Sequence, residues 1–157
     1  MSLHAATAAE IGRGLASRQY SSVEVTRHFL ERIERANPGL NAFVTVTAER
    51  ALEDAKRADL RLARGEGGPL TGVPLAHKDM FDIAGTPLRY GSRVRGRFVP
   101  ARTATVIERL EAAGAIRIGA LNMAEFALGA TGHNAIWGDC RNAVDPDHMA
   151  GGSSSGS

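Results

Sequence analysis

The alternation of two kinds of apolar pattern constrains the fold of this chain more than any other feature. Apolar side chains recur at helical spacing in three stretches, residues 21–39, 48–66 and 103–115. Short apolar runs of strand length lie between or beside them, at residues 40–46, 73–83 and 116–119. Helices that alternate with strands predict an α/β fold.

Local signals set the ends of the first periodic stretch. Ser21 and Glu24 have the spacing of a capping box, so we expect a helix to begin there. The sequence Asn37-Pro38-Gly39 is expected to end it.

The second half of the chain carries weaker signals. Thr103 is expected to cap the helix of residues 103–115, and Gly114 to lie just past its end. We expect a short helix at residues 122–128 and only loop from Gly129 to Ser157.

Composition excludes several classes of protein. The 157 residues are 43% hydrophobic and carry a nearly balanced net charge of +2, with acidic and basic residues intermixed, so direct nucleic-acid binding is not expected. The single cysteine, Cys140, allows no intrachain disulfide. Neither a secretory signal nor a membrane-spanning run is apparent, so we expect a cytoplasmic protein without a membrane partner.

Lys78 is the first residue that could carry chemistry. It follows the apolar run "VPLA", and in α/β proteins functional sites gather where strands end. Burial there would lower its pKa and make it a competent general base. The alternative is a solvated lysine paired with Asp79.

The last seven residues, "GGSSSGS", are the second candidate. Glycines let a ligand approach the backbone closely, and exposed N–H groups can bind an anion. The composition alone fits a flexible linker equally well.

Cys140 is the third candidate. It could pair with His133 or His148 as an activated thiol, or form a Glu-Lys-Cys set with Glu125 and Lys78. A small buried cysteine with no catalytic role is favoured over both. The five histidines lack ligand spacing, so no metal site is expected.

Three stretches taken together resemble a known family. They are "GPLTGVPLAHKDMFDIAGTPLRYGS", "TATVIERLEAAGAIRIGALNMAEFALG" and "WGDCRNAVDPDHMAGGSSSGS". In this order and spacing they resemble the amidase signature family of Ser-Ser-Lys hydrolases, which includes malonamidase-like amidases and the A subunit of Glu-tRNA amidotransferase. The resemblance implies a mixed β-sheet core flanked by helices. Residues 1–157 would be the truncated N-terminal portion of one domain, helical over about 5–65 and catalytic over about 70–157.

The resemblance also implies roles for individual residues. Lys78 matches the catalytic lysine, and Ser153 matches a bridging serine that follows a cis peptide bond. Such a pair should lie within hydrogen-bond reach, roughly 2.6–3.2 Å. Four neighbours would support the loop or the substrate: Gly151, Gly152, Ser154 and Ser155. The nucleophilic serine is expected beyond Ser157, so we expect the 157-residue chain to be inactive alone.

By this resemblance, the function is hydrolysis of a linear carboxamide through a seryl acyl-enzyme, with release of ammonia and no metal or organic cofactor. A homodimer is possible. One alternative is the A subunit of a Glu-tRNA(Gln) or Asp-tRNA(Asn) amidotransferase with B and C partner subunits; another is an inactive fragment or pseudoenzyme. Four departures from the family pattern favour a stand-alone amidase: Thr103, Ala120, Ala143 and Ala150.

Overall fold

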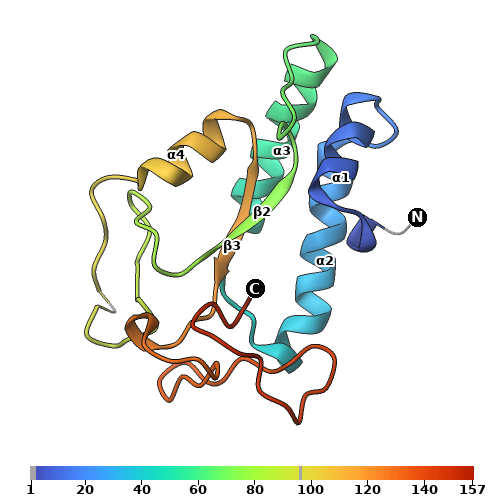
Figure 1. Ribbon diagram of the computed structural model, residues 1–157. Coiled ribbons are helices and arrows are strands. Elements are labelled where there is room, and N and C mark those ends of the chain that lie inside the picture. The colour runs from blue at the N-terminus through green and yellow to red at the C-terminus, as the bar shows by residue number, and fades with distance from the viewer. Residues whose placement is uncertain (1–2, 96) are drawn as a thin grey trace. The chain divides into compact units, whose positions relative to one another are not determined.

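The computed structural model describes residues 3–95 and 97–157 (Figure 1). Its elements follow in the order η1 (Leu3–Ala5), α1 (Ala8–Ala16), α2 (Ser22–Leu40), β1 (Phe43–Val46), α3 (Ala48–Ala63), β2 (Pro74–Lys78), α4 (Thr105–Ala112), β3 (Ile116–Leu121) and η2 (Glu125–Ala127). Helices alternate with strands, so the predicted α/β fold is confirmed. Within the described ranges, no helix is long and apolar enough to cross a membrane.

The three strands form one sheet in the order β1-β3-β2. β1 pairs with β3 in the antiparallel direction, with Phe43 opposite Leu121. Near the start of β3, Ile116 N donates to Val73 O at 2.8 Å, and at its end Asp79 N donates to Leu121 O at 3.1 Å. β2 and β3 therefore run parallel, and their carboxyl ends lie at the same edge of the sheet.

One compact unit of the chain comprises Met1–Ile33, Thr47–Leu75 and Glu108–Ile118. Its core is a cluster of four apolar side chains that are at most 4% exposed: Ile11, Leu15, Val25 and Val73. The inward positions of α3 also behave as their spacing indicates, with Ala51 and Ala55 fully buried.

α1 begins with a capping box that we did not predict from the sequence. Thr7 Oγ1 accepts from Glu10 N at 3.2 Å, and the Glu10 carboxylate accepts from Thr7 N at 2.7 Å. This reciprocal pair starts a helix whose Ile11 and Leu15 belong to the core. The spacing of Thr7 and Glu10 was the signal that could have indicated it.

The start of α2 was predicted well and its end was not. Ser21 Oγ accepts from Glu24 N at 3.1 Å, and the Glu24 carboxylate accepts from Ser21 N at 2.7 Å, which confirms the capping box. The helix continues through Pro38 to Leu40 and ends where Asn41 takes a positive φ of 51°. Pro38 lies in the last turn, so the helix ends two residues after it.

The second compact unit comprises Glu34–Val46, Ala76–Ile107 and Gly119–Ser157. The short helix predicted at residues 122–128 is wrong, because only a 3-10 turn at Glu125–Ala127 forms. Its backbone donors are used elsewhere: Ala124 N donates to Ser153 O at 3.1 Å and Phe126 N to Tyr90 O at 2.9 Å. The loop predicted from Gly129 onward is confirmed (Figure 1).

The predicted cap of α4 is also wrong. Thr103 Oγ1 accepts from Ala84 N at 3.0 Å, and the helix begins at Thr105. Gly114 lies beyond the helix end with a φ of +92°, as predicted.

Candidate active site

Lys78 is the last residue of β2, and the chain turns immediately after it. Met80 N donates to Lys78 O at 2.7 Å, while Asp79 N donates to Leu121 O and extends the pairing with β3. The backbone is therefore fixed on both sides of Lys78. Its side chain projects from the carboxyl end of a parallel pair of strands, the position where α/β proteins gather functional groups.

Ser153 is held at the end of the neighbouring strand. Residues 122–124 continue directly from β3, and Ala124 N donates to Ser153 O at 3.1 Å. The Gly152–Ser153 peptide bond is cis. Lys78 Nζ donates to Ser153 Oγ at 2.6 Å, within the range expected for a relay pair. The geometry makes proton transfer between these two side chains possible, and their catalytic roles stay a prediction.

The surroundings of Lys78 favour its neutral form. Burial lowers the pKa of its ammonium below the ordinary value of a lysine. Among the described residues, no carboxylate forms an ion pair with it, so the alternative pairing with Asp79 is not observed. The lowered pKa favours the neutral amine, which is the form that can accept a proton.

Asp79 behaves differently from its neighbour. It is 4% exposed, and burial raises the pKa of its carboxyl to about 6. The positive charge of Arg89 and the backbone N–H groups of Arg89 and Gly91 oppose that rise. Asp79 is thus a buried acid that titrates within the mildly acidic range.

The glycines of the terminal loop are needed for close backbone contact. Gly151 has a φ of +85°, a conformation that favours glycine. A Cβ on Gly152 would lie 2.8 Å from Gly129 O, and a Cβ on Gly156 would collide with Ala42 O. The loop therefore packs closely against its surroundings. The segment "GGSSSGS" is not a flexible linker in this structure.

The two serines after Ser153 differ in environment. Ser154 is exposed, and its carbonyl accepts from Ser157 N at 3.1 Å. Ser155 is 5% exposed, and its Oγ has no hydrogen-bond partner within the described part of the chain. In the described part of the chain, these two residues fasten the loop through their backbone carbonyls.

Two buried asparagines that sequence reasoning missed connect the loops around Ser153. Asn122 Nδ2 donates to Asn41 O at 2.9 Å and to Gly138 O at 3.1 Å, while its backbone carbonyl accepts from Gly156 N at 3.0 Å. Asn134 Nδ2 donates to Gly91 O and Met123 O, both at 2.9 Å. Asn122 directly follows an apolar strand, which does not identify its partners, and Asn134 lies in a predicted loop without even that signal.

Cys140 contacts the same loop through its thiol. Its Sγ donates to Ser155 O at 2.9 Å, and burial raises the pKa of the thiol. His133 instead pairs with Asp139 at 2.8 Å and His148 with Asp145 at 2.9 Å. Cys140 is buried, as we expected, and in the described residues neither histidine bonds to the thiol.

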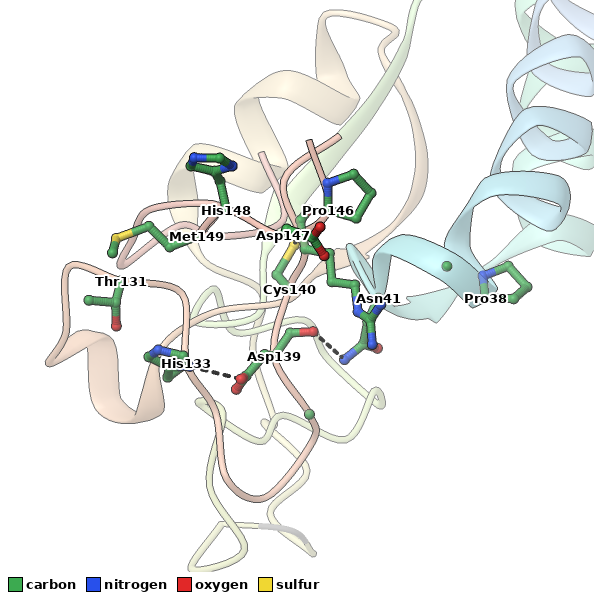
Figure 2. A pocket seen from close by; sticks show the side chains of 13 residues that line it. Pro38, Asn41, Thr131, His133, Asp139, Cys140, Pro146, Asp147, His148 and Met149 are labelled. Carbon is green, nitrogen blue, oxygen red and sulfur yellow. Dashed lines mark hydrogen bonds and ion pairs between the residues drawn. The ribbon is translucent and has the colours of Figure 1, made fainter. Parts of the chain in front are cut away.

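A cavity of about 900 Å³ opens beside Cys140. Figure 2 shows His133 directed at the Asp139 carboxylate, and Asn41 bonded to the backbone oxygen of Asp139, on its wall. In the part of the chain that the structure describes, no three His, Cys, Asp or Glu side chains gather as a metal ion would require.

Comparison with known proteins identifies the family to which this chain belongs. The family model described as Amidase matches residues 24–157, which is most of the chain. The chain belongs to the amidase signature family. The match includes both Lys78 and the loop that carries Ser153.

Curated relatives share almost the whole chain. The glutamyl-tRNA(Gln) amidotransferase A subunit of Azotobacter vinelandii is 47% identical over 99% of this chain, and that of Methylococcus capsulatus is 48% identical over the same share. The chain spans 32% of the length of each of these relatives.

Solved structures share the fold of this chain over about a third of their own length. A chain from a vestigial protein complex linked to the origins of an s-triazine catabolic enzyme matches with a TM-score of 0.93 and 41% identity, over 97% of this chain and 34% of that one. The peptide amidase of Stenotrophomonas maltophilia matches with a TM-score of 0.87 and 31% identity, over 96% of this chain and 32% of that one.

Proposed function

We propose that this protein contributes the lysine and bridging serine of an amidase that hydrolyses linear carboxamides. One observation carries the proposal, the 2.6 Å hydrogen bond between Lys78 Nζ and Ser153 Oγ at the carboxyl end of β2. Membership of the amidase signature family supports it.

The chemistry follows from the pair. Neutral Lys78 accepts the proton of Ser153 Oγ while Ser153 accepts the proton of an attacking serine, which the family pattern locates after residue 157. That serine adds to the amide carbonyl carbon. The relay then returns the proton to the leaving nitrogen, ammonia departs, and water hydrolyses the acyl-enzyme. Gly151, with its φ of +85°, and Gly152, packed against Gly129 O, support the loop that presents Ser153.

The test is ammonia release by the intact protein from a panel of simple carboxamides that includes glutamine. Lys78→Ala should abolish release, whereas Lys56→Ala should not, because Lys56 is an exposed lysine that pairs with Glu53 on the surface of α3. Near-full activity of Lys78→Ala at neutral pH would refute the proposal.

A second candidate is the A subunit of an amidotransferase, which applies the same chemistry to glutamine and passes ammonia to a partner. The names of the curated relatives favour it, since at 47% and 48% identity both are glutamyl-tRNA(Gln) amidotransferase A subunits. Co-expression with B- and C-type subunits should then give a stable complex whose glutamine hydrolysis exceeds that of the protein alone. A protein that works equally well alone and forms no complex is a stand-alone amidase.

A further inference from the structure

The excess of basic over acidic residues in this chain is concentrated in one loop between β2 and α4. Residues 83–107 contain five arginines and no Asp, Glu, Lys or His, although the whole chain carries only +2. We call residues 83–104 the arginine loop; Figure 1 shows it as the yellow-green to yellow connection between β2 and α4. Its arginines are Arg89, Arg93, Arg95, Arg97 and Arg102.

The base of the arginine loop is fixed. Ala104 N donates to Asp82 O at 2.8 Å, and further up Leu88 N donates to Phe98 O at 3.0 Å. Ile83 and Leu88 are buried and anchor one side of the loop. The residues on either side of the tip are therefore held in a defined shape, which reduces the entropy that a partner's binding would cost.

Two of the arginines stabilise the loop itself. The Arg95 guanidinium lies 3.9 Å from the centre of the Phe98 ring and 4.7 Å from that of Tyr90. Arg89 lies 4.6 Å from the ring of Trp137. These cation–π contacts cover one face of each ring and hold the two guanidinium groups against the protein.

The other three arginines face solvent. Arg93, Arg97 and Arg102 are exposed, and within the described residues none of them forms an ion pair or a side-chain hydrogen bond. Apolar side chains stand exposed beside them, with Val94 84%, Val99 50% and Phe98 41% exposed. Arginine mixed with exposed apolar side chains is typical of protein interfaces.

We propose that the tip of the arginine loop, residues 89–95 and 97–99, docks a polypeptide whose contact face combines Asp or Glu with aliphatic side chains. Carboxylates match the bidentate geometry of a free guanidinium, and aliphatic groups remove Val94 and Val99 from water. A nucleic acid fits less well, because its phosphates leave both valines exposed and Arg95 already occupies one face of the Tyr90 and Phe98 rings on which bases would stack. This surface is independent of the function proposed above.

The test is fluorescence anisotropy of labelled probes titrated with the intact protein. The probes are an octapeptide that alternates Glu and Leu, a tetra-Glu peptide of the same charge, and a single-stranded RNA octamer. The alternating peptide should bind at least about tenfold more tightly than the other two, because only it meets both the charge and the apolar surface. Equal or tighter binding of the RNA would overturn the proposal in favour of a nucleic-acid surface.

Variants locate the binding on the loop. Arg93→Glu with Arg97→Glu should weaken the alternating peptide at least about tenfold, whereas Arg32→Glu with Arg35→Glu should leave it unchanged. Arg32 and Arg35 are exposed on α2 and give the same change in net charge. No binding by the wild type, or equal loss in both arginine pairs, would contradict the proposal; if the Glu pair melts early, Arg93→Gln with Arg97→Gln replaces it.

A third pair of changes separates the apolar contribution from the charge. Val94→Ser with Val99→Ser should weaken the alternating peptide and spare tetra-Glu, because both valines are exposed and carry no charge. Equal binding of the alternating peptide by this variant and the wild type would contradict the aliphatic half of the proposal.

Discussion

Lys78 Nζ lies 2.6 Å from Ser153 Oγ, although 75 positions separate the two residues in the sequence. The parallel pairing of β2 with β3 explains the meeting. Lys78 ends one strand, and the segment that follows the other strand binds the Ser153 carbonyl through Ala124 N. The candidate relay therefore depends on the register of the sheet as much as on the two side chains.

Asp79 makes stability depend on pH. Its carboxyl has a pKa of about 6 in the folded protein against an ordinary value of 3.8, so between these values the folded state binds more protons than the unfolded state. The contribution of the protonated Asp79 carboxyl to the free energy of unfolding is therefore fully present below about pH 4. It is lost as the pH rises through about 6 and the buried carboxyl ionises. Asp79→Asn cannot ionise, so it should raise the free energy of unfolding by roughly 3 kcal/mol at about pH 7.5 and change it little at about pH 4.

Urea denaturation of both proteins at the two pH values measures this difference. An equal change at both values would show that ionisation of Asp79 is not the cause.

Gly156 is needed because the loop approaches β1 and β3 closely. A Cβ there would collide with Ala42 O and lie 2.8 Å from Asn122 N. Gly156→Ala should therefore destabilise the protein by about 1–3 kcal/mol, as overpacking does. Gly39→Ala is the matched control, because nothing lies within 4 Å of its added methyl group. Chemical denaturation of both variants checks this, and similar losses in the two would contradict it.

Cys140 should prove structural rather than nucleophilic. Its thiol is buried, has a raised pKa and donates to Ser155 O. A thiol reagent should react at least about 100-fold more slowly with the native protein than with the protein in urea. Cys140→Ala should keep ammonia release within about threefold of wild type, since it removes no reacting group. If it loses activity as fully as Lys78→Ala, the Glu-Lys-Cys set of Glu125, Lys78 and Cys140 has to be reconsidered.

The sequence predicted those elements whose signals are local. The capping box of Ser21 and Glu24, the buried face of α3 and the positive φ of Gly114 are all read from residues a few positions apart. Thr103 failed as a helix cap because its hydroxyl bonds Ala84, 19 positions away. Residues 122–128 failed as a helix for the same reason, since their donors bind Ser153 and Tyr90.

The candidate site was predicted from resemblance and not from spacing. Lys78 was already a candidate from its position after the run "VPLA", but its pairing with Ser153 was predicted only because both motifs match a family. Nothing in the intervening sequence indicates that the two residues meet. The hydrogen bonds of Asn122 and Asn134 join loops that are far apart in the chain, so single-sequence patterns carry no trace of them. Such nonlocal polar contacts are visible only in the folded structure.

The central claim is that Lys78 and Ser153 act as one proton relay, and a double-mutant cycle tests it most directly. We would measure kcat/KM for amide hydrolysis by the intact wild type, Lys78→Ala, Ser153→Ala and the double variant. Each single change should lower kcat/KM by at least about 1,000-fold, and the double variant should be no worse than the poorer single variant, because residues that act as a unit are not additive. Near-wild-type activity of either single variant, or losses that multiply in the double variant, would contradict the account.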